Sequence, residues 1–140
     1  MSAISLVTLG VADVGVSRKF YADAFGWTES PSSDEHIAFF DTGGPLFAVF
    51  GRSSLAHDAE VTAEGSGFRA VTCARNFAST DDVDAAFVKA VTEGAKPVKT
   101  PRAVFWGGYS SYVADPDGHL WEFAWNPFFS RDENGNVRAK

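Results

Sequence analysis

The feature that most constrains the fold lies near the C-terminal end, where two strand-like runs flank the turn Asp-Pro-Asp-Gly at residues 115–118. Proline presets φ and glycine tolerates positive φ, so this tetrapeptide favours a tight reversal of the chain. After the turn, aromatic residues occupy every second position, at Trp121, Phe123 and Trp125. Alternation in a strand places these rings on one face and Glu122 on the other. The sequence therefore predicts a β-hairpin with an aromatic face that must be packed and a lone carboxylate opposite it.

Two helix-like segments repeat one pattern along the chain. Gly26 and Gly94 lie 68 positions apart, and each closes an amphipathic segment that has an acidic residue near its start. Acidic residues at the beginning and a glycine just past the end are typical of helix boundaries. We predict helices over residues 15–25 and 81–93, and their repetition indicates a duplicated unit.

Strand-like runs fill the rest of each half, so that each half has the element order βαβββ. The strands are expected near residues 4–11, 27–31, 36–41, 45–51, 67–75, 96–100, 109–115 and 119–125. The predicted fold class is α+β, with two βαβββ modules that form a curved, mostly antiparallel sheet around a central cavity and with the helices outside. The expected organisation is a single domain over 1–129, with halves at about 1–51 and 67–127, a polar linker at 52–66 and a polar tail at 130–140.

The hairpin, with a glutamate four residues after its turn glycine, resembles the C-terminal signature of the vicinal oxygen chelate superfamily. This superfamily includes glyoxalase I, bleomycin- and fosfomycin-resistance proteins and extradiol dioxygenases. The N-terminal stretch 4–13 is similar to the opening of the same family, as are four residues that follow it: Ser17, Phe20, Tyr21 and Gly26. The likeness covers about residues 3–127 and implies the fold, whereas a shared fold does not determine a function.

The resemblance also implies where a metal would bind. Enzymes of the superfamily hold a divalent metal through one residue on each of four strands, and these positions fall on Leu6, Ala48, Phe68 and Glu122. Only Glu122 has a donor atom, whereas a catalytic metal needs about three protein ligands. We therefore expect no metal and no cofactor. The alternative, a metal-dependent lyase or dioxygenase of the lactoylglutathione lyase kind, requires ligands at other positions.

A small-molecule site is expected on the strand face that carries Glu122. Strand parity and the family resemblance assign to it Leu6, Phe50, Phe68, Trp106, Ser110, Tyr112 and Glu122. Glu122 and Tyr112 are the candidate catalytic residues, as acid–base groups of a metal-free enzyme. The same aromatic side chains also fit a packed core or a dimer interface, and Glu122 also fits a hydrogen-bonded structural acid. The sequence does not decide between a binding protein and an enzyme.

Composition excludes several classes of function. The formal net charge is −6 and no block of basic residues is present, so nucleic acid is not an expected partner. No apolar run is long enough to cross a bilayer and no signal segment is visible, so we expect a cytoplasmic protein without a membrane partner. The family resemblance implies a homodimer. The leading interpretation is a glyoxalase/bleomycin-resistance-like protein that binds a small apolar or aromatic molecule without a catalytic metal.

Overall fold

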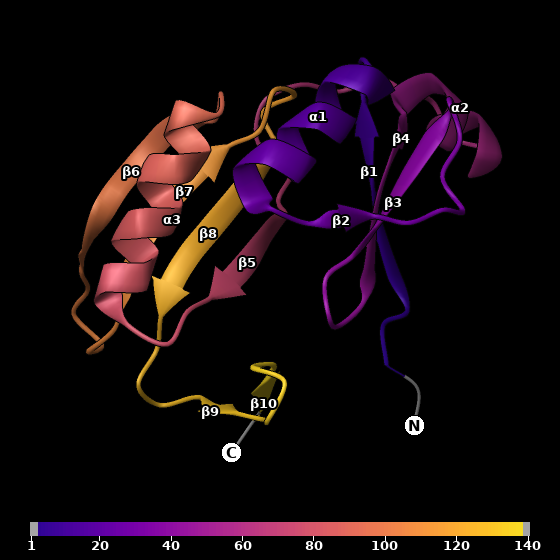
Figure 1. The fold of residues 1–140 in the computed structure, drawn as a ribbon. Helices are drawn as coiled ribbons and strands as arrows, with labels where there is room; N and C mark the ends of the chain where they lie inside the picture. The colour runs from indigo at the N-terminus through magenta and orange to yellow at the C-terminus, as the bar shows by residue number, and fades with distance from the viewer. Residues whose placement is uncertain (1–2, 139–140) are drawn as a thin grey trace. The chain divides into compact units, whose positions relative to one another are not determined.

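The computed structural model describes residues 3–138 as a mixed α+β fold with two four-stranded sheets and three helices (Figure 1). The chain divides into two compact units, Met1–Ala70 and Val71–Lys140. Each unit begins with a strand and a helix that are followed by three strands, so the predicted α+β class with two βαβββ modules is confirmed. Within the described residues, no helix is both long enough and apolar enough to span a membrane.

The first unit contains a sheet in the order β1-β4-β3-β2. The parallel pair β1 and β4 lies beside the antiparallel pairs β4/β3 and β3/β2. The elements of this unit are β1 (Leu6–Val11), α1 (Val14–Phe25), β2 (Thr28–Glu29), β3 (Ile37–Asp41), β4 (Leu46–Gly51) and α2 (Arg52–Asp58).

Helix α1 begins at an aspartate cap and packs an aromatic face against β3 and β4. Asp13 Oδ1 accepts a hydrogen bond from the Val16 amide at 3.1 Å, which satisfies one of the free amides of the first turn. The fully buried Tyr21 ring lies 4.6 Å from Phe47 and 5.0 Å from Phe25 between ring centroids. Burial of these aromatic rings stabilises this unit.

The second unit repeats the topology with a sheet in the order β5-β8-β7-β6. Strands β5 and β8 are parallel, and β8/β7 and β7/β6 are antiparallel. The elements are β5 (Thr72–Asn76), α3 (Thr80–Thr92), β6 (Lys96–Ala103), β7 (Tyr109–Ala114), β8 (Leu120–Trp125), β9 (Ser130–Arg131) and β10 (Val137–Arg138). The identical strand order in both units supports the duplication that the sequence indicates.

Helix α3 covers one face of the second sheet and packs on β6, β7 and β8 (Figure 1). The aromatic face predicted from the alternation lies on this side, since Trp121 and Phe123 are buried together with Val83 of the helix. Tyr109, on the same face, donates a hydrogen bond from its hydroxyl to Asp84 of α3 at 2.7 Å. Glu122 has the opposite parity, so it lies on the sheet face that α3 does not cover.

Three regions differ from the sequence-based expectation. The strand predicted over 67–75 begins only at Thr72, because Gly67 and Ala70 have φ of +74° and +60° and interrupt the extended backbone. The polar linker contains helix α2, which contacts β1 and β4. The polar tail folds into the β9–β10 hairpin over its described residues.

Candidate functional site

The residues that can act on a small molecule gather on the sheet face of the second unit that faces away from α3. In the β7–β8 ladder, Tyr112 lies directly opposite Glu122 and Ser110 lies opposite Ala124. Directly opposed residues of an antiparallel pair point to the same side of the sheet. The parallel neighbour β5 extends this face with Ala74, which pairs with Glu122, and with Thr72. We call the side chains of Thr72, Ser110, Tyr112 and Glu122 the carboxylate cluster.

A hydrogen bond holds the Glu122 carboxylate in place. The Ser110 hydroxyl donates to Glu122 Oε2 at 2.8 Å, and the serine is 2% exposed. The Tyr112 phenol lies beside Glu122, whose charge acts on the phenol, and Thr72 lies near the same phenol. Glu122 and Tyr112 are themselves half-buried, so both remain accessible from solvent. The cluster therefore presents an oriented carboxylate beside an aromatic ring.

The surroundings of Tyr112 favour its protonated form. Burial raises the pKa of the Tyr112 phenol above its ordinary value, and the charge of Glu122 raises this pKa further. The nearby Thr72 acts in the opposite direction. At neutral pH the phenol therefore keeps its proton.

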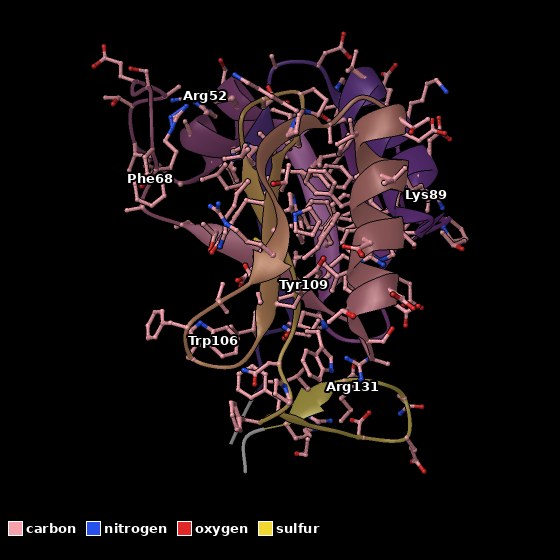
Figure 2. The ribbon with its side chains drawn as sticks, turned by 90° about the vertical axis from the view of Figure 1, so that its left-hand side faces the viewer. Arg52, Phe68, Lys89, Trp106, Tyr109 and Arg131 are labelled. Atoms are coloured by element: carbon pink, nitrogen blue, oxygen red, sulfur yellow. The ribbon has the colours of Figure 1, made fainter. Side chains whose placement is uncertain are left out.

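Trp106 lies in the turn that connects β6 to β7 (Figure 2). The turn is closed by backbone hydrogen bonds from Val104 N to Gly108 O and from Gly107 N to Val104 O, both 3.0 Å long. The indole ring lies over Gly108, where any Cβ atom would overlap it, and the side chain is 38% exposed. Trp106 thus packs on the backbone of its own hairpin, next to the start of β7.

The three remaining residues predicted for the site belong to the first unit. Leu6 lies at the start of β1 and Phe50 near the end of β4, both on the sheet face opposite to the one that packs α1. Phe68 lies outside the strands, in the segment before β5, and is 71% exposed (Figure 2). Because Phe68 precedes the strand, the position on β5 that belongs to the carboxylate cluster is Thr72 instead.

The residues present do not fit a catalytic metal. Of the four positions that the family resemblance assigns, Leu6, Ala48 and Phe68 have no donor atom. Glu122 is the remaining one, and its carboxylate already accepts a hydrogen bond from the Ser110 hydroxyl. Among residues 3–138, no three His, Cys, Asp or Glu side chains lie close enough together to hold a metal ion.

Strand parity in the sequence places Thr72 on the face of Glu122, which agrees with the ladder, whereas sequence reasoning missed Lys99. Lys99 on β6 lies opposite Tyr112, and its Nζ atom is 5.8 Å from the centroid of the phenol ring. Lys99 was missed because its face depends on irregular pairing between β6 and β7, for which the sequence carries no local signal.

The fold and this cluster define a duplicated βαβββ protein with a carboxylate on the β8 face that α3 does not cover, and comparison with known proteins identifies its family. Residues 3–123 match the model of the Glyoxalase/Bleomycin resistance protein/Dioxygenase superfamily, so the chain belongs to this superfamily. A crystal structure of a glyoxalase-related enzyme from Fulvimarina pelagi is similar over 99% of both chains, with 30% identity and a TM-score of 0.89.

Two further proteins show how far the similarity to known proteins extends. An uncharacterized protein of Arabidopsis thaliana is 32% identical over 136 residues, which cover 89% of this chain and 78% of the relative. A lactoylglutathione lyase from Agrobacterium tumefaciens shares 22% identity with a TM-score of 0.67, over 90% of this chain and 95% of that chain. At that identity the likeness to the lyase shows the fold alone.

Proposed function

We propose that this protein binds a small apolar or aromatic molecule on the face of the carboxylate cluster, without a catalytic metal. The observation that carries this proposal is the Ser110 hydroxyl, which donates a hydrogen bond to the Glu122 carboxylate next to Tyr112, on a sheet face where Glu122 and Tyr112 are only half-buried. Glu122 is thus oriented before any ligand arrives, which reduces the ordering cost of binding.

The chemistry of the cluster defines what such a ligand needs. The carboxylate accepts hydrogen bonds only, so it selects a hydroxyl or amine hydrogen on the ligand. The Tyr112 ring offers a flat apolar contact beside it, on which an aromatic or apolar body can pack. A small molecule with one polar hydrogen and a flat body therefore fits the face.

A thermal-shift screen of flat aromatic compounds tests this proposal. A compound at a hundredfold excess over its Kd stabilises the folded protein by about 2.7 kcal/mol, so binding raises Tm clearly. We expect Tyr112→Phe and Glu122→Gln to weaken the shift, and His36→Ala, an exposed residue of the first unit, to leave it unchanged. Equal shifts in all variants would show that the compounds bind elsewhere and would overturn the proposal.

A second candidate is a metal-free enzyme that uses Glu122 and Tyr112 for proton transfer. The observation in its favour is the direct cross-strand pairing of Tyr112 with Glu122, which places one proton donor beside one acceptor. Deuterium uptake from D₂O into a bound compound, followed by mass spectrometry, tests it. Uptake that Glu122→Gln abolishes would support the enzyme, whereas binding without uptake in the native protein supports the binding function.

We also propose that the protein forms a homodimer. Large apolar side chains are exposed within both units, and a second copy can cover them. They include Ile4, Leu6, Leu46, Phe105, Phe128 and Phe129. Sedimentation equilibrium at micromolar concentration should give twice the chain mass of 15.0 kDa. A mass of one chain would contradict the dimer.

A further inference from the structure

Strand β6 carries a basic residue at every third position. Lys96, Lys99 and Arg102 all lie within this strand, which forms one edge of the second sheet. In a regular strand, residues three positions apart point to opposite faces. Regular pairing would therefore separate Lys99 from the other two basic side chains.

Two irregularities in the ladder bring the three side chains to one face. Lys96 pairs with Ala114, Lys99 with Tyr112 and Arg102 with Ser110, and the register shifts between Pro97 and Lys99 and again between Lys99 and Arg102. Each shift inserts one residue of β6 and reverses the parity of the residues that follow. All three cations consequently share the face of the carboxylate cluster.

The charged groups on this edge are available to a ligand. Within the part of the chain that the structure describes, Lys96, Lys99 and Arg102 take part in no ion pair with an acidic side chain. The Lys99 Nζ atom lies 5.8 Å from the centroid of the Tyr112 ring, so the basic side chains of β6 adjoin the carboxylate cluster. The protein as a whole has a net charge of −6, and the basic edge is thus a local exception.

We propose that the molecule bound at the carboxylate cluster is an anion whose charged group lies against Lys99 and Arg102. This inference rests on the proposed function and names the chemical class of its ligand. Strand β7 separates β8 from β6, and two strand spacings are about 10 Å. A ligand can therefore place a hydroxyl or amine on Glu122, its flat body on Tyr112 and a carboxylate on the β6 cations, away from the negative charge of Glu122.

Three small compounds separate these contacts. 4-Hydroxybenzoate offers the hydroxyl, the ring and the anion, 4-hydroxybenzamide replaces the anion by a neutral amide, and 4-methoxybenzoate lacks the hydroxyl hydrogen. Titration into ¹⁵N-labelled protein, followed by amide chemical shifts, reports both the affinity and the place of binding. We expect 4-hydroxybenzoate to bind about tenfold more tightly than the amide, and added salt to weaken only the two carboxylates.

Variants then assign the preference to residues. Lys99→Gln and Arg102→Gln should each reduce the carboxylate-over-amide preference several-fold. Lys89→Gln, an exposed cation on helix α3 that lies on the other side of the sheet, is the matched control and should leave the preference unchanged (Figure 2). Amide spectra of each variant confirm that the fold is intact.

The outcomes distinguish this inference from the proposed function. Equal affinity for 4-hydroxybenzoate and 4-hydroxybenzamide, with shifts at the Ser110, Tyr112 and Glu122 amides, would overturn the inference that the ligand is an anion. The proposed binding function would be unaffected by this result. The basic residues would then only protect the edge strand. No shift at those amides with any of the three compounds at millimolar concentration would overturn the proposed function and this inference together.

Discussion

Tyr112 lies on the face of the carboxylate cluster, and the folded structure changes the acid–base behaviour of its phenol. Burial and the nearby Glu122 charge raise its pKa in the folded protein. For a group with a raised folded pKa, the associated stability is fully present below the unfolded value, here 10.0, and is lost as the pH rises through the folded value. The free energy of unfolding should therefore decline in alkaline solution, above the pH at which free tyrosine ionises.

Replacement of Glu122 by glutamine should lower the Tyr112 pKa toward its ordinary value. The substitution removes a negative charge beside the phenol but leaves the burial, which is the larger cause, in place. An ultraviolet titration of tyrosinate measures the change, with Tyr112→Phe to assign the curve. Tyr109, which hydrogen-bonds to Asp84 instead, serves as the internal control. An unchanged Tyr112 curve in Glu122→Gln would contradict the contact between the two side chains.

Gly108 allows the Trp106 ring to lie on the backbone of the β6–β7 turn. A Cβ atom at this position would overlap the indole, so Gly108→Ala must displace the ring. We expect a loss of about 1–3 kcal/mol in the free energy of unfolding, as for other overpacked sites, and a change in tryptophan fluorescence. Urea unfolding measures the first quantity.

A double-mutant cycle provides the control for this prediction. In a Trp106→Ala background the ring is absent, so Gly108→Ala should cost much less than in the native protein. An equal cost in both backgrounds would mean that the backbone conformation of Gly108, and not the tryptophan, requires glycine.

At the scale of elements, side-chain caps and ladder irregularities decide where helices and strands begin. Helix α3 begins after Ser79, whose side chain accepts a hydrogen bond from the Asp82 amide at 3.1 Å. We expect Ser79→Ala to destabilise the protein by about 1 kcal/mol, because a free amide of the first turn loses its acceptor. Thermal unfolding measures the loss, and Ser79→Asp, which retains an acceptor, should lose little. Equal losses in both variants would contradict the capping role.

The sequence predicted helices α1 and α3 and the main strands because their signals are local. The alternation around Glu122 and the turn at 115–118 place Glu122 and Tyr112 on one face, and the ladder confirms this register. The sheet face on which Lys99 lies was not predictable, because it depends on where the register between β6 and β7 shifts. Helix α2 was not predictable from its polar sequence, since its contacts with β1 and β4 form only in the folded unit.

At the scale of the whole molecule, both halves repeat one topology while their open sheet faces differ in chemistry. The first unit presents Leu6, Ala48 and Phe50 on the sheet face opposite α1, and the second presents the hydroxyl groups and carboxylate around Glu122. The two units thus share one framework, and the hydrogen-bonded carboxylate lies in the second. If the proposed function is correct, amide shifts caused by 4-hydroxybenzoate should be largest in β7 and β8, and shifts that are largest in β3 and β4 would contradict this.

The parallel pair at one edge of each four-stranded sheet has a consequence for how the chain folds. The first strand of each unit pairs with the fourth, as Leu6 does with Leu46 and Thr72 with Leu120. Loop-closure entropy must be overcome before such distant segments gain any pairing energy, so folding is expected to be slow for a chain of this size. During synthesis, β5 has no partner until β8 has left the ribosome. Until then its edge remains open to other chains, which makes the interval before β8 emerges the period of greatest aggregation risk.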